Sequence, residues 1–182
     1  MNANVKKYQT ALTRLATEFK FPFSVVAGIS LNESGCNPNV KPYFEKTWRY
    51  FTDKDGKPLG LTGDTIELQK HAFEIIGQAE YDFQVHAHGA FQTVGSVLRE
   101  LGYKPLEWTS DFYTQGYFAM KHLDNMRDRF VKKFRHEPSN EQLFAMYNGG
   151  FGAVDSDTWK DYVADYVRKG IGNYPQTQES VV

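Results

Sequence analysis

The chain has 182 residues, of which 41% are hydrophobic and 15% aromatic, so it can bury a core of its own. This length predicts one domain over residues 1–182, with a loose tail from about residue 176, and a monomer. Lys and Arg number 21 against 22 Asp and Glu, so the chain lacks the positive field with which proteins hold nucleic acid. This balance argues against nucleic acid as the main partner and makes a helical DNA-binding protein a poor interpretation.

The first residues and the cysteine content indicate the cellular compartment in which the chain is made and folds. Residues 1–7 lead directly into polar residues without the apolar stretch of a secretory signal, and no segment reaches the length of a transmembrane helix. The sole cysteine, Cys36, cannot form an internal disulfide, which favours folding under reducing conditions. We therefore expect synthesis in the cytoplasm without a signal peptide and without an integral membrane segment.

Two helices are predicted at the start of the chain. Apolar residues recur at spacings of three and four from Val5 to Phe19, which predicts an amphipathic helix on the domain surface. The next segment, residues 22–34, is apolar nearly all round, begins with Pro22 and is ended by Gly35. This pattern predicts a central buried helix.

The rest of the chain is predicted to be mainly helical, with one small hairpin. The turn sequence around Asp53 and Gly56 lies between β-prone stretches and makes residues 48–62 the β candidate. Asp64 and Ser139 are expected to cap helices, since each is followed three residues later by Glu or Gln. The predicted helices then cover residues 64–83, 91–101, 110–135, 143–147 and 157–169, the last closed by Gly170. The fold class is therefore mainly α, a single helical domain with a small β-hairpin.

Glu33 is the first candidate for chemistry, because it lies at the polar end of the most apolar helix. Burial disfavours its anion and the negative end of the helix dipole repels it, so both raise its proton affinity. A carboxylic acid that stays protonated near neutral pH suits donation to a glycosidic leaving oxygen. For an isolated Glu, a salt bridge or hydration at a helix end is the simpler interpretation.

Two further blocks strengthen the case for Glu33. In Gly89-Ala90-Phe91-Gln92, the glycine lets a ligand approach the backbone and the glutamine offers both a donor and an acceptor. In Tyr147-Asn148-Gly149-Gly150, an aromatic hydroxyl and an amide precede two permissive glycines. Alone, each block is weak evidence, and the second is also typical of an ordinary helix end.

Taken in order with Glu33-Ser34-Gly35, these blocks resemble the superfamily of goose-type lysozymes and soluble lytic transglycosylases. The resemblance covers about residues 22–170 and implies a lysozyme-like fold. It implies that Glu33 is the general acid, that the Gly89 block lines the saccharide cleft, and that Tyr147 contacts the glutamate or the substrate. It implies no cofactor and no metal.

A closer likeness is to the N-acetylmuramidases of phage lysins, in which a K-P-x-x-F-E stretch follows the glutamate block; here the corresponding residues 41–45 are Lys-Pro-Tyr-Phe-Glu, one residue shorter. Glu45 is then a candidate second carboxylate, because inverting glycosidases hold a base roughly 6.5 to 9.5 Å from the acid. A surface salt bridge is an equally good interpretation of Glu45. The candidate site comprises Glu33 and Glu45 as catalytic residues and, for the saccharide, Ser34, Gly89, Phe91, Gln92, Tyr147 and Asn148.

Weaker signals have simpler interpretations. If His86 and His88 lie on a strand, their alternation points both imidazoles the same way, and they could bind a metal with His71 or Asp82 as a further ligand. No zinc spacing motif supports this interpretation. Residues 53–56 resemble part of a calcium loop whose first and last ligand positions fail. The basic residues from Lys121 to Arg135 indicate a solvated face, or contact with an anionic wall or membrane as the less favoured alternative. The aromatic residues Tyr43, Trp48, Tyr50 and Phe51 suit either sugar stacking or a core.

These observations predict an enzyme that cleaves the β-1,4 bond between N-acetylmuramic acid and N-acetylglucosamine in bacterial peptidoglycan. If Glu45 activates water, the outcome is hydrolysis; if the substrate's acetamido group participates instead, it is the anhydro-sugar of a lytic transglycosylase. A wall substrate and the expected absence of a signal peptide favour a phage enzyme that acts after holin release or within a virion. The rival expectation is a catalytically inactive glycan-binding or virion structural module of the same fold.

Overall fold

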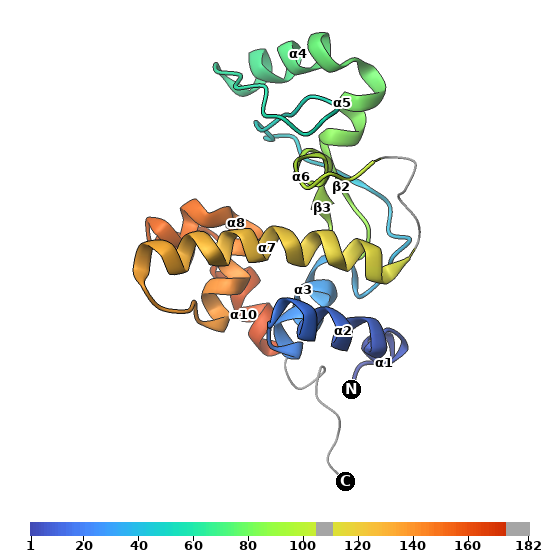
Figure 1. The fold of residues 1–182 in the computed structure, drawn as a ribbon, viewed down its shortest axis with the longest axis vertical. Helices are drawn as coiled ribbons and strands as arrows, with labels where there is room; N and C mark the ends of the chain where they lie inside the picture. Colours follow the sequence, from blue (N-terminus) through green and yellow to red (C-terminus); the bar gives the residue numbers. More distant parts are fainter. Residues whose placement is uncertain (105–110, 174–182) are drawn as a thin grey trace.

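The computed structural model describes residues 1–104 and 111–173. Its larger part is a bundle of helices around the main hydrophobic core, at the bottom of Figure 1. The long helix α7 crosses this bundle and packs against α2 and α8. The helices of the bundle are α1 (Ala3–Lys7), α2 (Gln9–Phe19), α3 (Phe23–Ser34), α7 (Phe112–Phe134), α8 (Asn140–Asp155), α9 (Trp159–Tyr162) and α10 (Ala164–Gly172).

A smaller part, at the top of Figure 1, holds the helices α4 (Thr65–Ile76), α5 (Gln78–Gln84) and α6 (Gly95–Glu100). It has its own small core, formed by Phe51, Leu68, Ala72 and Val85. The residue Arg99 is 5% exposed. Its side chain donates two hydrogen bonds to the Glu80 carboxylate, from Nε at 2.6 Å and from Nη2 at 2.5 Å. This bidentate pair joins α6 to α5.

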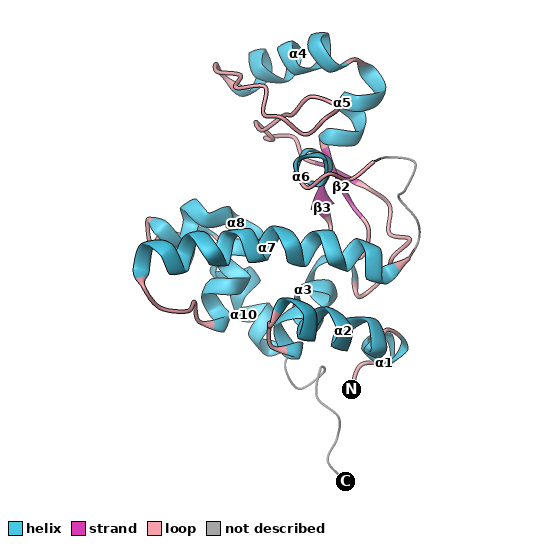
Figure 2. Cartoon of the chain, viewed as in Figure 1, coloured by secondary structure: helices cyan, strands magenta, loops and turns pink. Residues whose placement is uncertain are grey.

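A three-stranded antiparallel sheet lies between the two parts (Figure 2). It consists of β1 (Tyr43–Phe44), β2 (His86–His88) and β3 (Thr93–Val94), in the order β1-β2-β3. Tyr43 pairs with Ala87, which pairs in turn with Val94. The expected class, mainly α with a small β element, is confirmed.

The position of the hairpin was predicted wrongly. Within residues 48–62 the structure has only an isolated bridge between Thr52 and Pro58, around a turn in which the Asp53 carboxylate accepts hydrogen bonds from two backbone N–H groups. The sheet proper uses strands of two or three residues, too short for an alternating pattern to reveal them.

Several helix boundaries also differ from prediction, each for a local reason. The first helix is interrupted at Tyr8, and the helix after Asp64 breaks at Gly77, whose φ is 77°. Residues 91–94 form a turn and β3 rather than the start of α6. Helix α8 continues to Asp155 across a break at Gly150. The capping residues were predicted correctly: Asp64 caps α4, and Ser139 forms a capping box with Gln142.

Gly170 was predicted to end the last helix. It instead lies buried within α10. A Cβ at this position would approach the Phe144 ring to 2.5 Å. The glycine is therefore required for the close approach of α10 to α8, and this contact brings α10 beside the C-terminal half of α3.

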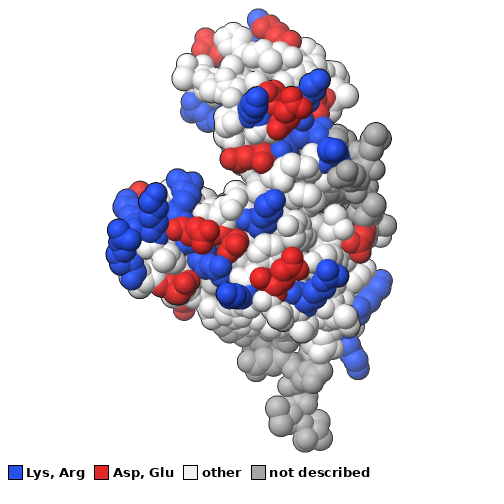
Figure 3. Space-filling model, in the orientation of Figure 1, with Lys and Arg blue, Asp and Glu red and all other residues white. Residues whose placement is uncertain are grey.

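The surface of α7 has mixed charge rather than an unbroken basic face. Arg127 pairs with Asp124, and Lys133 pairs with Asp155 on α8. Figure 3 shows acidic and basic side chains next to one another over this helix. In the described ranges, no helix combines the length and apolar character needed to cross a membrane.

Candidate active site

Glu33 lies in the last turn of α3, which ends at Gly35 in the left-handed conformation with φ 66°. The preceding turns, from Val25 to Ser30, are buried in the main core, so the helix holds the carboxyl rigidly where the core meets a cavity. The pKa of Glu33 is raised from 4.5 to about 7, mainly by burial and also by the nearby charge of Glu45. A proton is therefore retained on this carboxyl near neutral pH.

Tyr166 on α10 donates a hydrogen bond of 2.6 Å to Oε1 of Glu33. This bond favours the anion and opposes part of the rise in the Glu33 pKa, as does the charge of Lys169. The Tyr166 backbone is held in turn, because Asn32 donates to its carbonyl oxygen at 3.1 Å and Asn173 donates to the Asn32 amide oxygen at 2.8 Å. Tyr166 was not predicted from the sequence, because it lies at ordinary helical spacing in a segment with no recognisable block.

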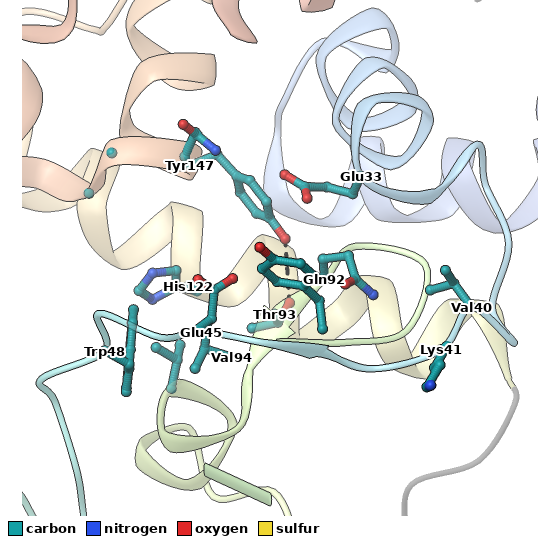
Figure 4. A pocket seen from close by; sticks show the side chains of 15 residues that line it. Glu33, Val40, Lys41, Glu45, Trp48, Gln92, Thr93, Val94, His122 and Tyr147 are labelled. Carbon is teal, nitrogen blue, oxygen red and sulfur yellow. Dashed lines mark hydrogen bonds between the residues drawn. The ribbon is translucent and has the colours of Figure 1, made fainter. Parts of the chain in front are cut away.

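Glu45 follows β1 directly, and its backbone N–H donates to the Val85 carbonyl oxygen at 2.9 Å. Its side chain lines the same cavity as Glu33 and points into it from the strand side (Figure 4). Burial raises the pKa of Glu45. The two carboxyl groups that the sequence singled out therefore share one cavity.

The cavity has a volume of about 690 Å³ and lies between the two parts of the molecule. It is lined by α3, the segment around β1, β3, α6, α7 and the part of α8 around its break at Gly150. The lining residues are Glu33, Val40, Lys41, Tyr43, Glu45, Trp48, Gln92, Thr93, Val94, Val97, His122, Tyr147, Asn148, Gly149 and Gly150. Val40, Thr93, Val94, Val97 and His122 had not been anticipated, because no block or spacing marks them.

Tyr147 lines this cavity, but its hydroxyl does not donate to Glu33. It donates to the Phe91 carbonyl oxygen at 2.5 Å and lies 3.4 Å from the Thr93 hydroxyl, the dashed line in Figure 4. Burial and the charge of Glu33 raise the pKa of Tyr147, so the hydroxyl stays protonated. Tyr147 therefore ties α8 to the turn before β3 while presenting its ring to the cavity.

The Gly89 block forms a tight turn that presents Gln92. Gly89 has φ 70°, and its carbonyl oxygen accepts bonds from both the backbone N–H and the side-chain amide of Gln92, at 3.1 and 2.9 Å. Gln92 lines the cavity, whereas Gly89 shapes the turn without lining it.

Like Gly89, two other predicted saccharide-binding residues do not line the cavity. The ring of Phe91 is 0% exposed and packs in the core against Phe112, so its assignment to the substrate was wrong. Ser34 does not line the cavity: its hydroxyl donates to the Ala90 carbonyl oxygen at 2.7 Å and accepts from the Asn37 N–H at 2.9 Å. Ser34 thus fixes the Gly89 block against α3, next to Glu33.

Of the aromatic candidates, Tyr43 and Trp48 line the cavity, and Tyr43 is 61% exposed. Phe51 belongs to the small core and Tyr50 does not reach the cavity. Among residues 1–104 and 111–173, no cluster of three or more His, Cys, Asp or Glu side chains could hold a metal ion. His86 and His88 instead bond to the carbonyl oxygens of Asp82 and Phe83.

Comparisons of the chain with protein-family models, curated proteins and solved structures found no match. A functional assignment therefore depends on the chemistry of the cavity and on the residue blocks that line it. The cavity offers a protonated carboxyl, a second carboxyl facing the same space, and amide and aromatic groups around them. This set is suited to acid-assisted cleavage of a polar, ring-containing substrate.

Proposed function

We propose that this chain cleaves the β-1,4 glycosidic bond between N-acetylmuramic acid and N-acetylglucosamine in peptidoglycan, with Glu33 as the general acid. The observation that carries the proposal is the Glu33 carboxyl, which has a pKa of about 7 and lines a cavity of about 690 Å³ that Glu45 also lines. The resemblance of the Glu33, Gly89 and Tyr147 blocks to lysozymes and lytic transglycosylases supports the choice of substrate.

In the first step, protonated Glu33 donates its proton to the glycosidic oxygen as the bond from the anomeric carbon to that oxygen breaks. The electron pair of the bond leaves with the oxygen, which departs as a hydroxyl, and positive charge develops on the sugar ring. Glu33 is then a carboxylate, stabilised by the hydrogen bond from Tyr166. Tyr166 therefore stabilises the state of Glu33 that proton transfer produces.

The second step has two routes, and both are compatible with the residues that line the cavity. Glu45 as a general base removes a proton from water, whose oxygen bonds to the anomeric carbon, which is hydrolysis with inversion. Alternatively, the acetamido oxygen of the substrate bonds to the anomeric carbon. The C6 hydroxyl then displaces it and returns its proton to Glu33, leaving a 1,6-anhydro end.

The resemblance to phage lysins supports a setting for this reaction. We infer a role in lysis of the host or in penetration of its wall, with release by a holin or delivery within a virion. The partner is then the bacterial wall polymer.

The test is digestion of purified Gram-negative sacculi by the purified chain in the presence of EDTA. The proposed steps use only protein carboxyl groups and substrate groups, so clearing should proceed without metal. Mass spectrometry of the products distinguishes the routes, because the hydrolysed and anhydro ends differ by one water. Binding to sacculi without any new saccharide ends would overturn the proposal in favour of an inactive glycan-binding module. Complete loss of clearing in EDTA, restored by zinc, would overturn the metal-free mechanism.

A further inference from the structure

His122 on α7 lines the cavity but has no hydrogen-bond partner among the residues that the structure describes. Three other polar side chains of the cavity lining are already engaged: Glu33 accepts from Tyr166, Gln92 donates to the Gly89 carbonyl oxygen, and Tyr147 donates to the Phe91 carbonyl oxygen. A partly buried imidazole with unused hydrogen-bonding capacity, facing an open cavity, is available to a ligand.

The protonation state of His122 indicates which chemical class of ligand it can bind. The pKa of His122 is lowered from 6.5 to about 4, mainly by burial and also by the charge of Arg129 on the same helix. The ring is therefore neutral at physiological pH and carries one N–H donor and one acceptor nitrogen. This pairing suits a neutral group that both donates and accepts, such as a sugar hydroxyl or an acetamido group, better than an anion.

The indole of Trp48 lines the same cavity and has a fixed orientation. Its N–H is directed to the Tyr50 carbonyl oxygen at 2.5 Å and to the Ser96 hydroxyl at 2.8 Å. Figure 4 shows Trp48, His122 and Glu45 toward one end of the cavity, and Val40 and Lys41 toward the other. A rigid aromatic ring beside a neutral polar group is a suitable platform for a pyranose, whose C–H face is apolar and whose edge is polar.

The break within α8 adds an open stretch to the cavity wall. Gly149 and Gly150 line the same cavity, and Gly150 has φ 72°. Apart from its own chain neighbours and nearby helix backbone, a Cβ built on Gly150 would meet no heavy atom within 4 Å, so the wall is open at this point.

We propose that Trp48 and His122 form a saccharide subsite at the Glu45 end of the cavity. One N-acetylhexosamine ring stacks on the Trp48 indole, and the His122 imidazole forms a hydrogen bond with a hydroxyl or acetamido group of that ring. The choice of an N-acetylhexosamine as the ligand rests on the proposed function. The exposure of Trp48 and His122 to the cavity is independent of the proposed function.

The subsite is tested by binding in an inactive background, so that cleavage does not interfere. A chain carrying Glu33→Gln, Trp108→Phe and Trp159→Phe retains Trp48 as its only indole, since the sequence has three tryptophans. Titration with the soluble pentamer of N-acetylglucosamine should change the Trp48 emission saturably. His122→Leu in this background should weaken binding roughly three- to tenfold, as expected for one neutral hydrogen bond.

Two matched variants separate recognition from folding. His122→Gln keeps a donor and an acceptor and should bind within about twofold of the parent. His71→Leu alters an exposed histidine on α4, outside the cavity, and should bind like the parent. Thermal midpoints within a few degrees of the parent establish that each variant is folded.

The outcomes also distinguish the subsite from the proposed function. Equal affinity of folded His122→Leu and its parent, or an unchanged Trp48 emission at saturating pentamer, would overturn the subsite even if the wild-type chain clears sacculi. Loss of binding in His122→Leu, with no cleavage of sacculi by the wild-type chain, would support the subsite and overturn the catalytic proposal.

Discussion

The Tyr166 hydroxyl donates to Oε1 of Glu33 over 2.6 Å, and this bond limits how far burial raises the pKa of the carboxyl. The two residues lie 133 positions apart in sequence and meet because α10 packs against α3. A buried carboxyl without such a donor would bind its proton still more tightly and release it less readily. The bond therefore holds the pKa near 7, where a general acid is both protonated and able to transfer its proton.

Tyr166→Phe should move the alkaline limb of the pH–activity profile to higher pH. Removal of the hydroxyl removes a bond that favours the anion, so the pKa of Glu33 rises above 7. Since the acid acts when protonated, activity falls as pH rises through that pKa. In the variant this fall should occur at a pH higher than in the wild type by on the order of one unit. Clearing rates between pH 5 and 9 measure the shift.

The control for this variant is Tyr113→Phe. Tyr113 also donates its hydroxyl to a carboxylate, that of Glu18, but it lies outside the cavity. Its profile should coincide with that of the wild type. An alkaline limb that does not move in folded Tyr166→Phe would show that Glu33 is not the group whose titration sets the activity.

Glu45→Gln separates the two routes of the second step. If Glu45 is the base, this variant should lose hydrolysis by about 10² or more, because positioned base catalysis is typically worth that factor. The lost negative charge should also lower the pKa of Glu33, moving any residual alkaline limb to lower pH. Wild-type rates with anhydro products would assign the second step to the acetamido group and leave Glu45 an electrostatic role.

Tyr147→Phe should reduce both turnover and stability modestly. The variant leaves the Phe91 carbonyl oxygen without the hydroxyl donor that now lies at 2.5 Å. One such bond is worth about 1 kcal/mol, so the free energy of unfolding should fall by about that amount. Turnover should fall several-fold, because the turn that presents Gln92 is tied to α8 through this hydroxyl. Unchanged turnover in a folded variant would remove Tyr147 from the catalytic machinery.

The helical part of the fold could be predicted because its signals are local. Pro22 and Gly35 mark the two ends of α3 in the sequence, and the structure has them as its caps. Ser139 and Gln142 form the capping box that predicts the start of α8. The sheet could not be predicted, because Tyr43 pairs with Ala87 across a long stretch of chain and each strand is too short to show alternation. Gly170 was misinterpreted because a glycine at a close helix contact and one that ends a helix look alike in sequence.

The candidate site was predictable where the residue blocks mark it. Glu33, Glu45, Gln92, Tyr147 and Asn148 all line one cavity. The blocks could not indicate which members face the cavity and which position the backbone, so Phe91 and Ser34 were misassigned. Tyr166 and His122 were missed because only tertiary packing brings Tyr166 on α10 to Glu33 and His122 on α7 to the cavity.

Glu33→Gln should abolish cleavage and leave the fold intact or more stable. Glutamine keeps the shape of the side chain and can still accept the hydrogen bond from Tyr166, but it has no proton to give the leaving oxygen. The rate should fall by at least about 10² to 10⁴.

The stability of Glu33→Gln should depend on pH with a defined sign. The folded-state pKa of Glu33 is raised from 4.5 to about 7, so the wild type loses stability as pH rises through that window and then levels off. Glutamine does not ionise. The two proteins should therefore unfold alike near pH 4, whereas near pH 8 the variant should be more stable by at most on the order of 3 kcal/mol, less where water in the cavity screens the charge. Thermal midpoints at both pH values, measured with clearing rates, provide the check. Activity within a few-fold of wild type would refute Glu33 as the acid, and a midpoint lowered at pH 8 would identify it as a structural ion-pair residue.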